Sequence, residues 1–366
     1  FWGKSKNIIV TYYYDDRTDK AHQSRLDCKI LRSVILHYDE EDLATIREDW
    51  KRIQKKVASG HADQLSESDT NYLAACTKGA NASSMRDAPA PEGSGVHAIR
   101  AKQRAFSYKS SYMTAIAERA LNSRIEDYRL PMPVEQTLPE YITQCMNPYL
   151  DMPVHEIAWR LAVKQDKSKQ FKSKLVLKML GTERKSVTDI EQFRKANITK
   201  LKTIVFYPDG LPKEHMSFRA ITPEEWQEIA DSDARWEDSF LYRFFEENKF
   251  FLVAFDSPVP HAKHVGENDV LKNGFLWNMP EKDVDLYVKP VWEKLHNLMV
   301  ERKSVHYSRG TNLLPGPSFN EVFHLRPKAR DGKDVIQLPN GEYVTKQCFW
   351  LDRRYIARII HEKRGE

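Results

Sequence analysis

The feature that most restricts the fold of this chain is an internal repeat. Four short words occur in the same order in both halves: NIIVTYY and KFFLVAF, DWKRIQKKV and VWEKLHNLM, YLAACTKGANAS and FHLRPKARDGKD, KQRAFSYKSSYMTAI and KQCFWLDRRYIARI. The spacing agrees, because Val10 precedes Trp50 by 40 residues and Val253 precedes Trp292 by 39. Chance similarity of short apolar words is the alternative, but ordered words at matched spacing favour a duplication. We therefore expect two related units.

The two copies differ in what precedes the first word. About 110 residues separate the predicted linker from KFFLVAF, whereas only six precede NIIVTYY. We expect that the first copy lacks its front half. Either the chain is a fragment, or the missing half is a separate chain and a partner of this one.

Hydrophobic periodicity predicts a mixed α/β fold. Residues 7–16, 198–210 and 249–256 form β-branched or aromatic runs typical of strands, and a Pro-Asp-Gly turn closes the second. Helical spacing marks 42–60, 140–148, 154–163 and 290–303, and 102–121 runs from a strand or turn into a helix. Prolines at 131, 133 and 139 predict a linker. The predicted boundaries are residues 1–127, a Pro-rich linker at 128–140, and residues 141–366.

Composition restricts the class of protein. Hydrophobic residues make up 41% of the chain, which is enough for packed cores and excludes a disordered protein. The net charge of +5 permits an anionic partner without requiring one. No run of about 18 apolar residues occurs, so we expect no membrane partner. Four cysteines without a CxxC pair predict free thiols in a reducing cytoplasm.

The stretch AACTKGANASS, residues 74–84, presents a single cation among small residues. Such a loop can approach a grooved polyanion closely, because lysine donates to guanine, asparagine pairs with adenine, and small polar groups contact phosphate. Basic and hydroxylic segments follow it in both copies. The alternative for each residue is an ordinary solvated surface. The candidate DNA-binding residues are Lys6, Thr77, Lys78, Gly79, Asn81, Ser83, Ser84, Lys102, Arg104, Ser107, Lys109, Ser110, Arg326, Lys328, Arg330, Lys346, Arg353 and Arg354.

The words DWKRIQKKVASG, YLAACTKGANAS and RAFSYKSSYMTAI resemble the mismatch-repair endonuclease MutH. They resemble even more the GATC-cleaving type II restriction endonucleases that carry two MutH-like domains. The resemblance covers nearly the whole chain and implies tandem PD-(D/E)xK folds, each a mixed sheet with flanking helices around a DNA cleft. It implies that the loop at Cys76, Thr77 and Lys78 reads bases, as does the segment around Ser107. MutH has Arg-Pro-Lys at that loop, which the second copy keeps as Arg326-Pro327-Lys328.

The resemblance also implies Mg²⁺-dependent cleavage of both DNA strands by an Asp and a Glu-x-Lys. Those carboxylates would lie upstream of the first residue, so Mg²⁺ ligands are expected outside this chain. An auxiliary catalytic lysine matches Lys4. The second copy has Lys200-Leu201-Lys202 where Glu-x-Lys would stand. It is therefore expected to be catalytically dead and to bind a second DNA site as an allosteric half.

Other candidate sites in the sequence are weaker. The words Glu183-Arg184-Lys185 and Glu301-Arg302-Lys303 match E-x-K without a paired Asp on a strand, and His261 with His264 forms an isolated HxxH. The expected function is GATC-specific binding and cleavage within a restriction–modification system. A non-catalytic DNA-binding regulator of the same family and a protein-interaction scaffold with basic faces are the alternatives.

Overall fold

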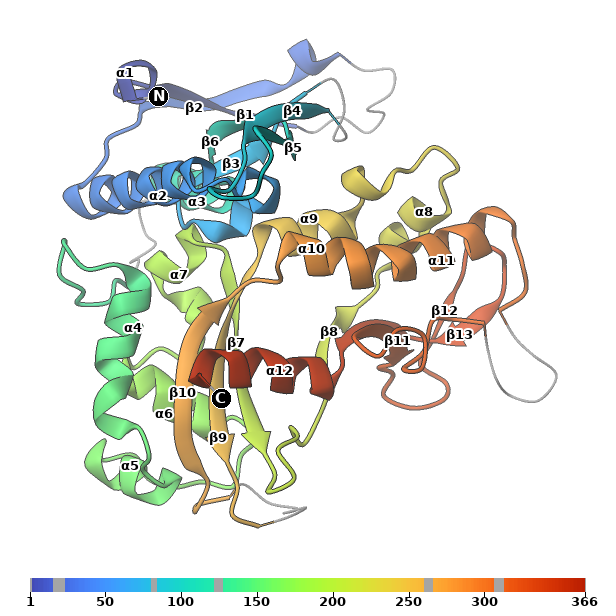
Figure 1. The fold of residues 1–366 in the computed structure, drawn as a ribbon. Helices are drawn as coiled ribbons and strands as arrows, with labels where there is room; N and C mark the ends of the chain where they lie inside the picture. The colour runs from blue at the N-terminus through green and yellow to red at the C-terminus, as the bar shows by residue number, and fades with distance from the viewer. Residues whose placement is uncertain are drawn as a thin grey trace.

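The computed structural model describes residues 2–15, 24–79, 84–121, 128–259, 266–305 and 313–365. It is a mixed α/β structure, as the sequence predicts. Figure 1 shows the first unit, residues 2–121, lying against one end of the second unit, residues 138–365. None of the helices in the described ranges is long and apolar enough to cross a membrane.

The first unit consists of three antiparallel strand pairs and two main helices. Its pairs are β1 with β2, β3 with β6, and β4 with β5. Short 3₁₀ turns cover 25–27, 62–64 and 67–69. The elements are α1 (Trp2–Ser5), β1 (Ile9–Tyr14), β2 (Lys29–Ile35), α2 (Glu40–Ala58), β3 (Leu73–Thr77), β4 (Met85–Pro89), β5 (Ala98–Lys102), β6 (Arg104–Tyr108) and α3 (Ser110–Leu121).

The second unit begins with helices that cover one side of a three-stranded sheet. That sheet has the order β10-β9-β7, with β7 parallel to β9 and β10 antiparallel to it. Its elements up to β10 are α4 (Leu138–Met146), α5 (Val154–Arg160), α6 (Phe171–Met179), α7 (Glu191–Lys195), β7 (Ile198–Phe206), β8 (Met216–Ala220), α8 (Pro223–Ala230), α9 (Phe240–Glu247), β9 (Lys249–Asp256) and β10 (Val270–Trp277).

A second antiparallel sheet, β11-β14-β8, and the β12–β13 hairpin complete this unit. A π turn at 284–288 leads into α11. The remaining elements are α10 (Glu281–Asp283), α11 (Lys289–Val300), β11 (Phe323–Pro327), β12 (Val335–Gln337), β13 (Tyr343–Thr345), β14 (Gln347–Leu351) and α12 (Arg353–Arg364).

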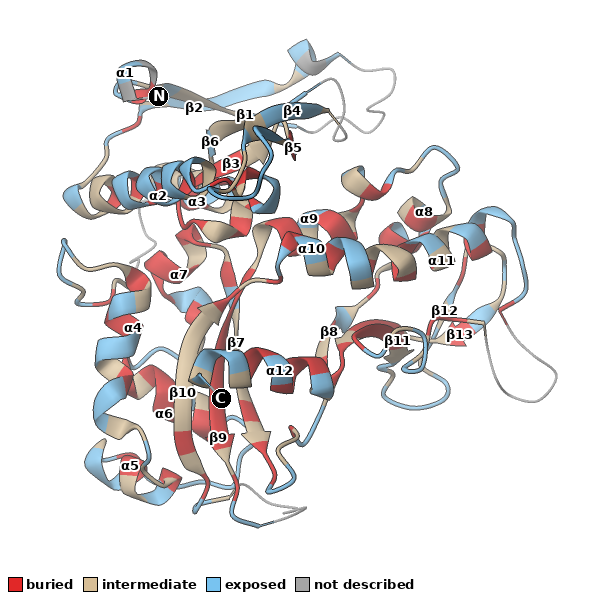
Figure 2. Ribbon diagram, in the orientation of Figure 1, coloured by how far each residue is buried: buried red, intermediate tan, exposed pale blue. Residues whose placement is uncertain are grey.

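Local chemistry explains where the predicted elements begin and end. The Asp39 side chain accepts a hydrogen bond from the Asp42 backbone N–H at 2.8 Å and so caps α2. The helix stops before Gly60, whose φ of +81° and contact with Pro91 leave no room for a side chain. The apolar run of β9 is buried along almost its full length, as predicted for 249–256 (Figure 2). The strands predicted at 7–16 and 198–210 and the helices at 140–148, 154–163 and 290–303 are confirmed, with ends shifted by a few residues.

The order of elements repeats between the two units. Each series begins with an antiparallel strand pair and a helical segment, namely β1–β2 with α2 and β9–β10 with α10 and α11. A strand, a hairpin, a strand that pairs with the one before the hairpin, and a helix follow. These are β3, β4–β5, β6 and α3 in the first unit, and β11, β12–β13, β14 and α12 in the second. Lys78 follows β3 as Lys328 follows β11, and each donates its backbone N–H across to the partner segment, at 2.7 Å to Gln103 and 2.8 Å to Lys346. This correspondence supports the internal repeat. Strands β7 and β8 have no counterpart among the described elements of the first unit.

The predicted linker is packed into the core near both of its ends. Leu130 is only 3% exposed, Tyr128 forms a bridge with Ile190, and α4 already begins at Leu138. One hydrophobic cluster joins Tyr72 and Tyr112 of the first unit to helices and strands of the second. The segment is therefore held in the core by Leu130 and Leu138, whereas Pro131, Pro133 and Val134 between them are exposed.

Candidate nucleic-acid interface

The floor of the candidate interface is β7, which carries Lys200 and Lys202. Residues two apart on a strand point to the same face, so both ammonium groups lie over one side of the sheet. Lys202 Nζ donates to the carbonyl oxygen of Ser217 on β8 at 3.1 Å. Lys200 Nζ lies 5.9 Å from the ring centre of Phe218.

Lys328 joins these two lysines from the segment after β11. Its Nζ donates to Ser217 Oγ at 3.1 Å and also to the carbonyl oxygen of Phe218. Burial lowers the pKa of Lys200, and the positive charges of Lys328 and Arg219 lower it further. Burial and the neighbouring ammonium groups lower the pKa of Lys202 to about 8. The ammonium groups of Lys200, Lys202 and Lys328 thus all lie beside Ser217 and Phe218 of β8.

A groove with a volume of about 790 Å³ opens over these lysines between α6 and β7. A second hollow of about 490 Å³ shares Lys202 and Ser217 with it and adds Lys167, Lys169 and Lys213. We call the two hollows together the β7 groove. The first hollow is lined by two acidic side chains and by seven basic ones, namely Lys174, Lys178, Arg184, Lys185, Lys200, Lys202 and Lys328. Such an excess of positive charge in a concave surface is typical of polyanion binding.

Several predicted residues of the first unit lie on its surface. Lys6, Lys78, Gly79, Ser107 and Ser110 are exposed. The partly buried ones are Thr77, at the end of β3, and Ser84. Asn81 and Ser83 lie outside the described residues, and the structure describes the backbone of Lys4, in α1, but not its side chain.

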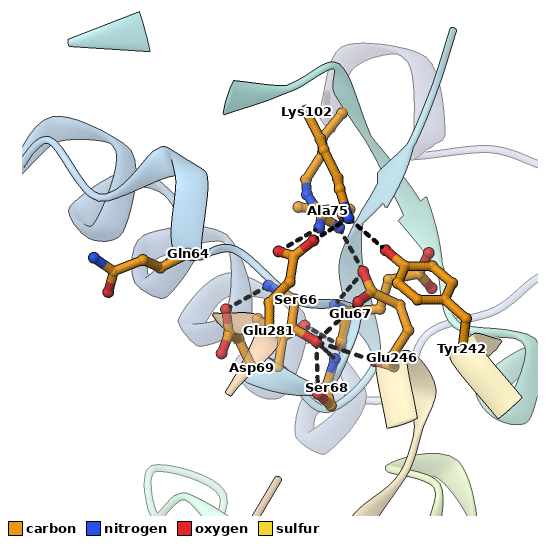
Figure 3. Close-up of polar contacts among 12 residues, drawn as sticks. Gln64, Ser66, Glu67, Ser68, Asp69, Ala75, Lys102, Tyr242, Glu246 and Glu281 are labelled. Carbon is orange, nitrogen blue, oxygen red and sulfur yellow. Dashed lines mark hydrogen bonds and ion pairs between the residues drawn. The ribbon is translucent and has the colours of Figure 1, made fainter. Parts of the chain in front are cut away.

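Lys102 and Arg104 occupy a different environment from the predicted one. Figure 3 shows Lys102 directed at Glu281 and Tyr242 of the second unit, with an ion pair to the former and a 3.0 Å hydrogen bond to the latter. The Arg104 side chain, only 6% exposed, pairs with Glu246 at 2.7 Å and Glu281 at 3.1 Å. Because their charges are neutralised between the two units, we leave both residues out of the proposed DNA interface.

Lys109 is also enclosed rather than presented to a ligand. It is 3% exposed, and its backbone N–H donates to the Tyr72 carbonyl at 2.9 Å. Burial lowers the pKa of its ammonium group to about 8, with the nearby Asp49 and Glu67 carboxylates acting in the opposite direction. A buried lysine next to acids is a structural residue, so the DNA interface does not include it.

The predicted residues of the second copy surround the β11–β14 pair, and Lys328 alone among them lines the β7 groove. Arg326 stacks on Trp350 at 5.3 Å, which fixes its guanidinium. Lys346 pairs with Asp334 at 2.6 Å, and Arg354 with Glu321 at 3.3 Å. Arg330 is exposed beside Asp331, and Arg353 is partly buried at the start of α12.

The residues at β7 do not fit Mg²⁺. That ion binds carboxylate, carbonyl and water oxygens. In β7, by contrast, Lys200 and Lys202 present ammonium groups at the first and third positions of Lys200-Leu201-Lys202, where Glu-x-Lys would have one carboxylate and one ammonium group. Within the described ranges, no three His, Cys, Asp or Glu side chains converge on a point that could hold a metal ion. We derive no catalytic step through a metal in this part of the chain.

The two E-x-K words are surface segments. Glu183 forms an ion pair with Lys178, and Glu301 forms one with Lys303. His261 and His264 lie outside the described residues. Cys28, Cys76, Cys145 and Cys348 form no disulfide, as predicted.

Sequence reasoning missed the wall of the β7 groove. Lys167, Lys169 and Lys174 come from the run KQDKSKQFKSK at 164–174, whose lysine density was the available signal. Arg184 and Lys185 come from the loop after α6. These residues become one surface only when α6 packs beside β7.

The excess of basic side chains in the β7 groove is typical of proteins that bind polyanions, and comparison with known proteins gives a more particular result. No protein-family model matches the chain. Over 405 aligned residues the chain is 29% identical to the type II restriction enzyme Sau3AI of Staphylococcus aureus, and the alignment covers 99% of this chain and 78% of that enzyme. This similarity supports a relationship to type II restriction endonucleases.

Proposed function

We propose that this chain binds double-stranded DNA as the recognition part of a MutH-like type II restriction endonuclease specific for GATC. The observation that carries the proposal is the similarity to a type II restriction enzyme along 99% of the chain. The positive β7 groove supports it, because a DNA-binding protein needs a concentrated basic surface that the modest net charge alone does not guarantee.

Two parts of the molecule divide the task in this proposal. The β7 groove binds phosphates, which gives affinity that falls as salt rises. The exposed Lys78 and Gly79 at the end of β3 contact base edges, since a lysine on a small-residue loop can enter the major groove. With the exposed Lys78 in the first unit and the β7 groove in the second, the chain binds two DNA sites at once, the second unit acting as an allosteric half.

Cleavage belongs to the complete restriction reaction and uses Mg²⁺ as its cofactor in this proposal. The described residues offer no fitting ligand set for that ion. We therefore assign DNA recognition to them. Lys4, in α1, remains the proposed auxiliary lysine of the first copy.

Fluorescence anisotropy and a cleavage assay on the same duplexes test the proposal. Binding of this chain to a GATC duplex and to a scrambled duplex is measured across a salt series, and the products are then examined after Mg²⁺ is added. We expect tighter binding to GATC, and affinity that falls steeply with salt. Equal affinity for both duplexes would remove the GATC assignment, and the absence of binding to either would overturn the DNA-binding function.

The non-catalytic regulator is the second candidate, and it is favoured because the described residues of both units offer no cluster of His, Cys, Asp or Glu that could hold a metal ion. Cleavage separates the two candidates. GATC cutting by the full coding sequence supports the nuclease, whereas specific binding without cutting under the same conditions supports the regulator.

A further inference from the structure

Lys200, Lys202 and Lys328 meet at one position in the floor of the β7 groove. Two are partly buried and come from alternate positions on one face of β7, and the third is exposed in the segment after β11. Their ammonium groups are connected through β8, because Lys202 and Lys328 both donate to Ser217, and Lys328 and Lys200 both contact Phe218. Residues more than a hundred positions apart in sequence thus form one cationic cluster, the lysine triad.

The triad has no ion-paired acid among the described residues, and the carboxylate of Glu214 in the second hollow acts on Lys202 only through its charge, which raises the pKa of that lysine. None of its three members forms an ion pair in the described part of the chain, and the carboxylate of Glu183 in the same groove is taken by Lys178. Two more deeply buried lysines pair with acids, Lys172 with Asp269 at 2.8 Å and Lys195 with Asp42 at 2.6 Å. The buried Lys249 donates instead to neutral oxygens of Thr70 and Asn71. Adjacent unpaired ammonium groups repel each other, so their retention in a concave surface indicates an anion from outside the protein.

We propose that the lysine triad binds a phosphodiester group of DNA directly, so that the second unit holds DNA without a divalent cation. This inference rests on the proposed DNA-binding function and names the group that makes the contact. The ammonium groups offer N–H donors to phosphate oxygens, and together they supply the positive charge that a metal ion would supply elsewhere.

The surroundings of the triad favour a polymer over a small phosphate. The groove continues past the triad along α6, where Lys174 is exposed, and to the loop after α6, where Lys185 is exposed. A single phosphate would fill only the floor, whereas a backbone with regularly spaced phosphates can reach floor and rim together.

The test combines a triple substitution with removal of divalent cations. In Lys200→Gln/Lys202→Gln/Lys328→Gln, each side chain keeps an N–H₂ donor for the β8 contacts but loses its charge. The matched control is Lys51→Gln/Lys55→Gln/Lys282→Gln, which removes the same charge from exposed positions that line neither hollow. Dissociation constants for a GATC duplex are measured by anisotropy with EDTA and with Mg²⁺.

The expected results are specific to the triad. Wild-type Kd changes by less than about threefold when EDTA replaces Mg²⁺, and the triple variant binds at least about tenfold more weakly, with a salt slope smaller by about two to three. The control variant stays within about threefold of wild type. The melting temperature of the triple variant is expected to equal or exceed that of wild type, because mutual repulsion is removed.

Three outcomes would overturn the inference. Equal binding by the triple and control variants would show that the triad does not contact DNA, although the proposed function would stand. Loss of wild-type binding in EDTA would show that a metal ion makes the contact. If wild type fails to bind DNA in either buffer, the proposed function itself fails.

A thermal-shift measurement with inorganic phosphate distinguishes the source of the ligand. Suppose the triple variant loses phosphate-dependent stabilisation yet binds DNA as the control does. The triad is then a site for free phosphate, and its assignment to DNA is wrong.

Discussion

Lysines of this protein lie in contrasting surroundings. Lys102 and Lys195 are held against carboxylates, whereas Lys200 and Lys202 stand beside another cation in a groove. The sequence alone does not distinguish lysines that pair with carboxylates from those that do not, because both kinds are flanked by ordinary polar and charged residues. The difference arises from which strands and helices the fold places opposite each side chain.

The depressed pKa of Lys202 predicts that DNA affinity depends on pH. With a pKa of about 8, well below the usual value for a lysine side chain, its ammonium group loses its proton in the free protein above about pH 8, and bound phosphate opposes that loss. Between pH 7 and pH 9, at constant ionic strength, we expect Kd to weaken by about fivefold to tenfold.

Lys202→Arg is the matched variant for this pH dependence, because arginine stays charged over the whole range. Its Kd should change much less between the two pH values. A wild-type Kd that is equal at both, or an unaltered dependence in the variant, would contradict the assignment of the titration to Lys202.

Substitution of Lys78 tests whether this residue distinguishes GATC from other DNA sequences. Lys78→Ala should reduce the preference for GATC over a scrambled duplex by about 1–3 kcal/mol, since one base contact is lost. Anisotropy on both duplexes measures it, with Lys55→Ala on the exposed face of α2 as the control. Unchanged discrimination in Lys78→Ala would exclude a readout role.

At the scale of elements, the buried ion cluster joins β6 of the first unit to α9 and α10 of the second. Arg104 donates to Glu246, to Glu281 and to the carbonyl oxygen of Ala75 at 2.7 Å. Desolvation of the guanidinium opposes this arrangement, and the two carboxylates outweigh it, so that the pKa of Arg104 is raised. The cluster therefore fixes how the two units meet (Figure 3).

Removing this cation leaves two carboxylates buried together. We expect Arg104→Met to lower the free energy of unfolding by about 3–5 kcal/mol. Arg100→Met serves as the control, because the Arg100–Asp87 pair is exposed and contributes less than about 1 kcal/mol. Urea unfolding followed by circular dichroism measures both, and equal effects would mean that the cluster adds no more than a surface pair.

Most elements could be predicted from the sequence, and the candidate site only in part. The helical spacing of apolar residues predicted α2 and α11, and the continuous apolar run at 249–256 predicted β9. The repeat also placed Lys78 and Lys328 at equivalent strand ends. The pairing of Arg104 and the assembly of the β7 groove could not be predicted, since both depend on contacts between segments distant in sequence.

At the scale of the whole molecule, the two units form one structure. The shared core joins Tyr72, Leu73 and Tyr112 to residues of the second unit. Lys249, at the start of β9, donates to the carbonyl of Thr70 at 2.6 Å and to Asn71 Oδ1 at 2.7 Å. A repeat in sequence therefore does not produce two independent bodies here.

This shared core predicts a single cooperative unfolding transition. Differential scanning calorimetry of the chain should give one peak, with calorimetric and van't Hoff enthalpies in agreement. Two resolved transitions would show that the first unit unfolds separately and that the contacts between the units contribute little to its stability.

Amide hydrogen exchange of the chain with and without a GATC duplex shows whether DNA occupies the β7 groove. If it does, DNA slows exchange in residues 164–185, in β7, and around Lys78 and Lys328, while α5 and the exposed face of α2 are unchanged. Protection confined to surfaces away from the groove, or no protection at DNA concentrations that saturate binding, would contradict it.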